Sequence, residues 1–437
     1  MTIVPWIVQL VAFFVLMSIG CGILAAARLP LTRRSVLLAP ALGTAAVTVT
    51  SMTLGTLGLA AHSYAAILVA ALVVGSAAVL RTKLAAVARA LPPLSAAALV
   101  AASIFIAAPS FLYGFSWVGF ANEDMTRTAM SGEHWRAHGL TEAVSKSDLI
   151  WNTNIASAQL GNTGTLQAGT PDLVAVFMEL TGIGTFQSMM PVVVIAFMCL
   201  LAAMGAMMPW RLGDRWVALA ILALATSGLI VYTAVNQGAD EIIGLALFCA
   251  YTAVLPALWR PRASRSWFII AALLLAGLFE LYVPLTIFAV LLTAAHAFLR
   301  VRRRRLGPLL SRAALGAAAA ALFLNVYLHN VALTATSMLK SGSGPLHDNI
   351  KFIAFFIPPG FAYLWGLLPL SSYPPEPAMS LLIVLGMALT AAFTVLAVQR
   401  ARRGNAPALM AVICLVFFAY FFVRMADYAL YKSASYI

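Results

Sequence analysis

The sequence predicts an all-α, polytopic helical membrane protein, and three observations predict this class. First, 62% of the 437 residues are hydrophobic and only 9% are charged, whereas soluble domains carry about 25% charged residues. Second, apolar runs of about 20 residues, enough to cross a hydrocarbon core roughly 30 Å thick, recur along the chain. Third, basic and acidic residues fall in alternate links between these runs. We expect about 12 spans, with two sizeable extracytoplasmic loops that carry interfacial helices.

The predicted spans follow one another with short links, except at two places. Their ranges are 3–27, 36–61, 64–80, 92–113, 186–209, 216–235, 242–259, 267–280, 283–299, 308–332, 378–398 and 406–423. The first span has no basic residue before it, so we expect an uncleaved helix with an outer N-terminus. Basic links flank residues 267–299 on both sides, so the chain must enter the membrane and return to the same side within this short stretch. Two short helices meeting at a Pro-marked turn would satisfy this, as would a re-entrant pair.

The links on one side of the membrane are basic. Twenty of the 27 Lys and Arg residues lie in them, and Asp214 is their only carboxylate. These residues are Arg28, Arg33, Arg34, Arg81, Lys83, Arg89, Arg211, Arg215, Arg260, Arg262, Arg265, Arg300, Arg302, Arg303, Arg304, Arg305, Arg312, Arg400, Arg402 and Arg403. Lys and Arg collect on the cytoplasmic side of membrane proteins. The N-terminus and the acidic loops are therefore expected outside a bacterial-type inner (plasma) membrane.

This charge pattern also bears on partners. In a soluble protein the net charge of +13 would suggest nucleic acid. Here the basic links would contact anionic lipid headgroups of the bilayer instead, so no nucleic-acid partner is expected. No basic link exceeds about a dozen residues or contains a glycine-rich phosphate loop. We therefore expect no nucleotide cofactor, and a substrate that is lipid-linked, pre-activated or freely available at the outer face.

Two long polar stretches divide the chain, and we expect four parts. They are N-terminal transmembrane helices (1–91), a membrane core (92–332) with a large outer loop (114–185), a second outer loop (333–377) and C-terminal transmembrane helices (378–437). The large loop closes with a short apolar helix at 172–181. The apolar segment 350–370 contains Pro358-Pro359-Gly360, which prevents a straight span. We expect this segment to lie in the outer interface, with Tyr363 in the headgroup zone.

The cysteines and two histidines are expected to be packing residues. The four cysteines, Cys21, Cys199, Cys249 and Cys414, lie inside apolar runs with no close pair, as small apolar residues do. We expect the same of His296 and His329. No spacing of His, Cys and Asp in the chain is typical of a structural metal site.

The best candidate site is the pair Glu123 and Asp124, which follows the fourth span. At the outer membrane surface, one carboxylate would take a proton from an attacking hydroxyl group while the other binds a metal or orients the base. General-base catalysis of this kind accelerates a reaction by about 10²–10⁴-fold. The alternative is a solvated loop whose acids cap a helix that starts nearby.

Histidine and arginine follow in the same loop. His134 and Arg136 flank Trp135, and such a group would bind a phosphate and stack on a sugar, since Arg is a bidentate phosphate ligand. The alternative is a surface helix that Trp135 anchors in the membrane interface.

Other ionisable residues are candidates because charged groups at membrane depth are costly and often functional. Asp240 lies in an outer turn, and Glu280 lies between two apolar residues at the outer tip of the short helix pair. The alternative for Glu280 is that its side chain only reaches the headgroup layer. In the second outer loop, His347, Asp348 and Lys351 would contact a phosphate or a sugar.

Taken together, residues 92–437 resemble the GT-C superfamily of integral-membrane glycosyltransferases. The shared features are many spans, a large outer loop with acidic residues just after an outward-running helix, and later outer loops with interfacial helices. Glu123 and Asp124 are similar to the acidic first-loop motif with which the family activates the acceptor, sometimes with a divalent metal. Asp124 is the better match to the catalytic aspartate and is a possible ligand of Mg or Mn. In this chain three spans precede the helix that leads into the acidic loop, whereas the family usually places that loop after its first helix.

The resemblance implies a polyprenyl-phosphate-linked sugar donor, whose phosphate the second outer loop would contact, and a glycan or lipid acceptor. We therefore expect a glycosyltransferase. One alternative is a polymerase or ligase of lipid-linked glycans, which would use Arg and His of the outer loops. Another is a transporter or flippase for a lipid-linked or small polar solute. Transporters usually show repeats and polar residues at mid-membrane, and neither is visible in the sequence.

Overall fold

The computed structural model describes residues 3–117, 123–142, 168–260, 264–301, 307–325, 328, 358–368, 375–424 and 427–437. Every regular element among them is a helix, which confirms the predicted class. The first ten are α1 (Val4–Ala26), α2 (Arg33–Thr56), α3 (Ala61–Leu80), α4 (Leu84–Ala90), α5 (Pro93–Ile106), α6 (Ala108–Tyr113), η1 (Gly114–Ser116), α7 (Glu123–Ala137), α10 (Gly169–Thr181) and α11 (Thr185–Met207). They are followed by η2 (Trp210–Leu212), α12 (Asp214–Ala225), α13 (Gly228–Val235), α14 (Ala239–Leu258), α15 (Arg265–Leu281), α16 (Val283–Val301), α17 (Gly307–Leu324), α19 (Gly360–Leu364), α20 (Ala378–Arg402), α21 (Ala406–Val423) and α22 (Asp427–Ser435).

Within the described ranges, seven helices are long and apolar enough to cross a membrane, namely α1, α2, α3, α11, α14, α20 and α21. Two bent pairs, α4 with α5 and α12 with α13, raise the number to nine if each pair is one span. Helix α15 has 17 residues, and the described apolar parts of α16 and α17 are no longer than that. The protein is therefore a multi-pass membrane protein, and the number of about 12 spans stays a prediction.

Helices α2, α11 and α14 form the centre of the bundle. About nine-tenths of each span is buried, 89%, 94% and 89%, whereas only 17% of α20 is buried. The apolar side chains that α20 exposes, such as Leu381 at 69% and Val384 at 62%, are suited to lipid, because a bilayer core contains no water.

Glycines bring α1 and α2 into close contact. A Cβ atom at Gly20 would lie 1.9 Å from the carbonyl oxygen of Ala39, and one at Gly43 would lie 2.0 Å from that of Leu16. Small residues of this kind let two membrane helices approach backbone to backbone.

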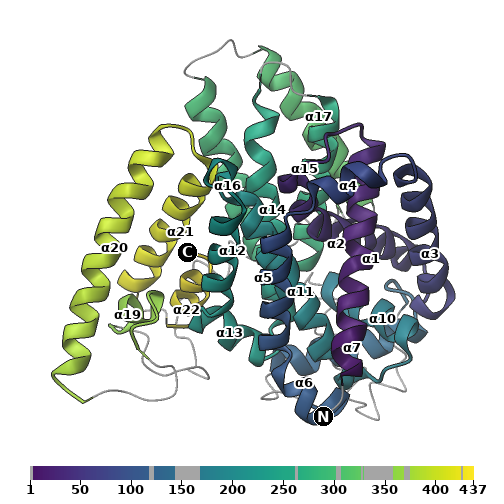
Figure 1. Ribbon diagram of the computed structural model, residues 1–437, viewed down its shortest axis with the longest axis horizontal. Coiled ribbons are helices and arrows are strands. Elements are labelled where there is room, and N and C mark those ends of the chain that lie inside the picture. The colour runs from purple at the N-terminus through teal and green to yellow at the C-terminus, as the bar shows by residue number, and fades with distance from the viewer. Residues whose placement is uncertain are drawn as a thin grey trace.

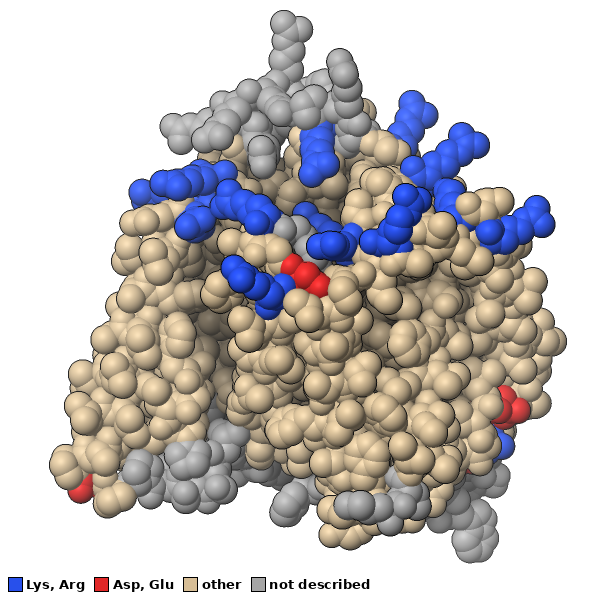
Figure 2. All heavy atoms as spheres, viewed as in Figure 1, with Lys and Arg blue, Asp and Glu red and all other residues tan. Residues whose placement is uncertain are grey.

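The two ends of the bundle differ in charge. The N-terminus, α6, α7 and α10 lie at one end, and α4 and α17 lie toward the other (Figure 1). Figure 2, in the same view, shows Lys and Arg gathered at the end of α4 and α17. We refer to these as the loop end and the basic end.

The structure gives three outcomes for the loops. Helices α15 and α16 meet at Tyr282, which is the predicted pair of short helices. The predicted helix at 172–181 is α10, which begins earlier, at Gly169. Helix α19 covers only Gly360–Leu364 of the predicted interfacial segment, of which residues 350–357 lie outside the described part. Tyr363, expected among headgroups, is 3% exposed and packs in an apolar cluster with α21 and α22.

The packing predictions for the cysteines are confirmed. All four are buried and free of disulfides. His296 is fully buried, with its ring 6.3 Å from that of Trp259. His329 lies outside the described residues.

Candidate functional site

The predicted catalytic pair lies at the start of α7. Glu123 and Asp124 are the first two residues of this helix, and their side chains lie outside the described part of the molecule. Acidic residues in a first turn are favoured by the positive end of the helix macrodipole, as the helix-capping alternative requires. The same position also attaches two carboxylates to a regular element at the loop end, which the catalytic interpretation requires.

Helix α7 packs along α10, and the two helices run in the same direction. A Cβ atom at Gly132 would lie 2.9 Å from Cγ1 of Val174 and 3.1 Å from the carbonyl oxygen of Pro171. One turn later, Nε of Arg136 donates to Oε2 of Glu179 at 3.1 Å. Because these contacts fall later along α7 than along α10, the first turn of α7 extends beyond the first turn of α10.

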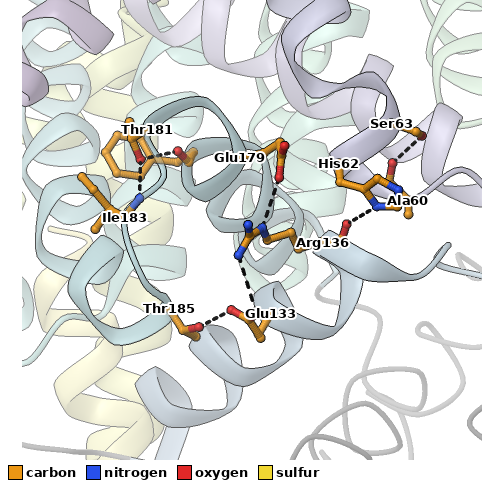
Figure 3. Close-up of polar contacts among 10 residues, drawn as sticks. Ala60, His62, Ser63, Glu133, Arg136, Glu179, Thr181, Ile183 and Thr185 are labelled. Carbon is orange, nitrogen blue, oxygen red and sulfur yellow. Dashed lines mark hydrogen bonds and ion pairs between the residues drawn. The ribbon is translucent and has the colours of Figure 1, made fainter.

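Arg136, predicted to bind phosphate, is paired with carboxylates of its own chain (Figure 3). Besides the bond to Glu179, its Nη1 lies 3.8 Å from Oε1 of Glu133. Thr185 donates to the other oxygen of Glu133, and Nδ1 of His62 lies 2.9 Å from the carbonyl oxygen of Arg136. The Arg136 side chain is still 40% exposed. A phosphate that bound there would compete with Glu133 and Glu179.

His134, the other predicted contact on α7, stacks on a second histidine. The rings of His134 and His138 are 4.4 Å apart and 18° from parallel. Nδ1 of His138 lies 3.1 Å from Oε1 of Glu142, and this hydrogen bond lowers the pKa of Glu142. Trp135 is only 2% exposed and belongs to the main apolar core. It therefore does not anchor α7 in the membrane interface, as one alternative required.

Asp172, which the sequence analysis treated only as the start of a helix, is buried in the first turn of α10 at 1% exposure. The hydroxyl group of Tyr64 donates to its Oδ1 at 3.0 Å and lies 2.8 Å from the hydroxyl of Ser51. Oδ2 of Asp172 is buried and has no hydrogen-bond partner among the described residues. Helix α10 is not one of the helices that are long enough to cross a membrane. Burial raises the pKa of Asp172 to about 7.

Glu280, a predicted site residue, is buried next to Asp172. It lies at the end of α15, is 1% exposed, and does not reach the headgroup layer. A Cβ atom at Gly169 would lie 2.7 Å from its carbonyl oxygen, so α10 begins directly against α15. The charge of Asp172 acts unfavourably on that of Glu280. We refer to Ser51, Tyr64, Asp172 and Glu280 as the acidic junction.

The acidic junction is suited to hold a proton. Oε2 of Glu280, like Oδ2 of Asp172, is buried without a hydrogen-bond partner in the described part of the chain. Two neighbouring carboxyl groups in such a place do not both ionise easily, because burial and mutual repulsion oppose the second charge. A shared proton, or a polar group of a bound molecule, would relieve both effects.

A second buried acid lies beside the predicted site residue Asp240. Asp240 and Glu241 open α14, and Asp240 is partly exposed whereas Glu241 is 1% exposed. Lys432 of α22 donates to Oε2 of Glu241, and the hydroxyl of Ser435 donates to its Oε1 at 2.8 Å. This carboxylate is already neutralised, so Glu241 holds the C-terminal helix in place.

The second-loop candidates His347, Asp348 and Lys351 lie outside the described residues. Within the described residues, no group of three or more His, Cys, Asp or Glu side chains is arranged to hold a metal ion. The side chain of Asp124 lies outside the described residues, so a metal at Asp124 stays a prediction.

Comparisons of the chain with protein-family models, with curated proteins and with solved structures give no match.

Proposed function

We propose that the protein is a membrane glycosyltransferase that moves a sugar from a polyprenyl-phosphate-linked donor to a glycan or lipid acceptor. The observation that supports this most is the position of Glu123 and Asp124 in the first turn of α7, at the loop end, opposite the end where most Lys and Arg residues gather (Figures 1 and 2). Helix α7 is braced against α10 through Gly132 and Arg136. Catalytic groups need such support from a regular element.

In this proposal Asp124 acts as the general base. It takes the proton of an acceptor hydroxyl group while that oxygen bonds to C1 of the sugar. The bond between C1 and the carrier phosphate breaks, and the phosphate leaves with the electron pair. Glu123 orients the acceptor, and His134, Arg136, His347 and Lys351 contact the substrate. The predicted Mg or Mn ion at Asp124 remains part of the proposal, and no step above depends on it.

The proposal includes an orientation. The basic end faces the cytosol of a cell with a bacterial-type inner membrane, and α7 and α10 face outward, because Lys and Arg collect on the cytoplasmic side. It also counts α15, α16 and α17 as crossings, which with the seven long helices and two bent pairs makes about 12 spans.

The test is sugar transfer by the Asp124→Asn variant. Purified protein in lipid is given a radiolabelled polyprenyl-phosphate sugar and a mixed acceptor pool, and the labelled product is measured. We expect the rate to fall by about 10²-fold or more, since general-base help is of that size. The control is Glu142→Gln, which removes an exposed acid, 54% accessible, from the end of the same loop segment. Full activity of Asp124→Asn would remove the assignment.

The acidic junction favours a second candidate, a proton-coupled transporter. Buried ionisable residues in membrane proteins often form proton relays, and Asp172 and Glu280 are such a pair. Against this candidate, Glu280 lies at the end of α15 and not at its middle, whereas transporters bind near the bilayer midplane. Proton uptake by proteoliposomes that Glu280→Gln abolishes, together with unchanged sugar transfer in Asp124→Asn, would favour the transporter.

A further inference from the structure

A cavity of about 620 Å³ opens at the basic end of the bundle, remote from α7 and α10. Its walls are the N-terminus of α2, the C-terminal end of α11, Pro256 of α14 and the link from α20 to α21. Neither the predicted catalytic pair nor the acidic junction contributes to it. Its volume falls in the range of about 300–1,000 Å³ that is usual for small-molecule sites.

Within the part of the chain that the structure describes, two arginines and no acidic residue line the cavity. Arg33 is exposed, and Arg34 is partly buried. Nη2 of Arg34 donates to the carbonyl oxygen of Ala253, and its Nε is buried without a partner among the described residues. The charge of Arg260 also acts unfavourably on Arg34. The walls therefore concentrate positive charge, and an anion in the cavity would relieve the repulsion.

Two long helices add to this field, because both begin at the cavity. The N-cap of α2 is Thr32 and that of α21 is Asn405, and both residues line the walls. A helix N-terminus carries the equivalent of about half a positive charge, and phosphate groups bind at such ends. The arginines and the two helix N-termini therefore all contribute positive potential to the cavity.

The remaining wall is apolar. Met207, Met208, Pro209 and Pro256 face the cavity, at the ends of two central helices, α11 and α14. A free phosphate ion would gain nothing from these side chains. An amphiphile would place its charged group on the arginines and its first carbons on the methionines.

We propose that this cavity binds the phosphate headgroup of an anionic membrane lipid from the leaflet at the basic end. Basic pockets between membrane helices are known to recognise such headgroups. In the bound state the phosphate accepts hydrogen bonds from Arg33 and Arg34, and the glycerol region packs on Met207 and Met208. The site is independent of the proposed sugar transfer.

Lipid retention by the full-length protein tests this site. Protein purified in detergent is incubated with cardiolipin or with phosphatidylethanolamine, and bound lipid is counted by native mass spectrometry. We expect the wild type to retain cardiolipin in preference. Arg33→Gln should weaken retention about fivefold, and the double change with Arg34→Gln about thirtyfold, from the loss of one and two arginines. Met208→Glu, which leaves both arginines in place, should also weaken retention because it adds a negative charge.

The matched control is Arg89→Gln. Arg89 is an exposed arginine of α4 in another basic link, outside the cavity, and its replacement should leave retention unchanged. Equal retention of the two lipids by the wild type would overturn the proposal, as would unchanged cardiolipin retention in the double variant and in Met208→Glu. Displacement of the lipid by millimolar inorganic phosphate alone would also overturn it, because the site would then belong to a free ion.

Discussion

The carboxyl group of Asp172 is held away from water, and among the described residues only Tyr64 donates a hydrogen bond to it, at Oδ1. An acid in this position resists ionisation, and a charge on Asp172 would in turn oppose ionisation of the neighbouring Glu280. At the residue scale, the charge of the acidic junction therefore depends on whether Asp172 carries its proton. That state is accessible to measurement independently of any substrate.

Asp172 should make stability depend on pH. Burial raises its pKa from 3.8 to about 7, so between these values the folded protein holds a proton that the unfolded chain has lost. The free energy of unfolding should therefore fall as pH rises from about 4 to about 7, by up to about 4 kcal/mol, and then level off. Asp172→Asn keeps an acceptor for Tyr64 but does not titrate, so it should flatten this dependence.

The measurement is the thermal midpoint of the protein in detergent over that pH range. Glu142→Gln serves as the control: the lowered pKa of this exposed acid acts against the fall, so the fall in stability between about pH 4 and about pH 7 should persist in that variant. The same slope in Asp172→Asn and in the wild type would show that Asp172 is not the titrating group.

Residue patterns in the sequence predict part of this site. Asp172 is followed by an apolar run, Leu173 to Met178, which indicates burial of this segment but does not single out one face of the helix. Glu280 is identified by its apolar neighbours. The hydrogen bond from Tyr64, however, joins residues 108 positions apart. Such a contact depends on the packing of α3 against α10, which no local pattern encodes.

At the scale of elements, α22 returns the chain from the end of α21 to the bundle. Its Lys432 and Ser435 bind the buried Glu241 of α14. The hydroxyl of Tyr436 lies 2.8 Å from that of Tyr282, between α15 and α16. A short polar helix thus becomes part of the fold through a few directed contacts.

Lys432→Met should release α22. Removing one partner of a buried ion pair leaves an uncompensated charge and costs about 3–5 kcal/mol. The double change Glu241→Gln with Lys432→Met should recover most of this loss, because no lone carboxylate remains. Protease removal of a C-terminal epitope tag, followed over time, would report the release. Equal protection in the single and double variants would argue against the ion pair as the anchor.

Hydropathy predicts the elements better than it predicts their breaks. The long central helices α2, α11 and α14 match three predicted spans closely. The predicted span 216–235 is instead α12 and α13, bent by 58°. At the bend the hydroxyl of Thr226 donates to the carbonyl oxygen of Ala223 at 3.0 Å. A side chain of this kind competes with the helix backbone, and a window of mean hydropathy does not detect it.

At the scale of the whole molecule, α2 connects the basic cavity with the acidic junction. Arg33 and Arg34 at its start line the basic cavity, and Ser51 near its end belongs to the acidic junction. Its 24 residues make a helix about 36 Å long, close to the thickness of a bilayer. A buried helix of this length keeps the basic cavity and the acidic junction apart, toward opposite ends of the bundle.

Labelling from one side of the membrane tests whether the basic end or the loop end of the bundle faces the cytosol. The four native cysteines are buried, so a membrane-impermeant maleimide should report only on introduced ones. Thr141 is an exposed residue that follows α7, and Thr82 is an exposed residue between α3 and α4. In spheroplasts the Thr141→Cys variant should be labelled and the Thr82→Cys variant protected, and both should react after permeabilisation. The positive-inside rule gives this expectation. The opposite pattern would place Asp124 in the cytosol, where the proposed transfer at the outer face has no acceptor, and the glycosyltransferase assignment would fail.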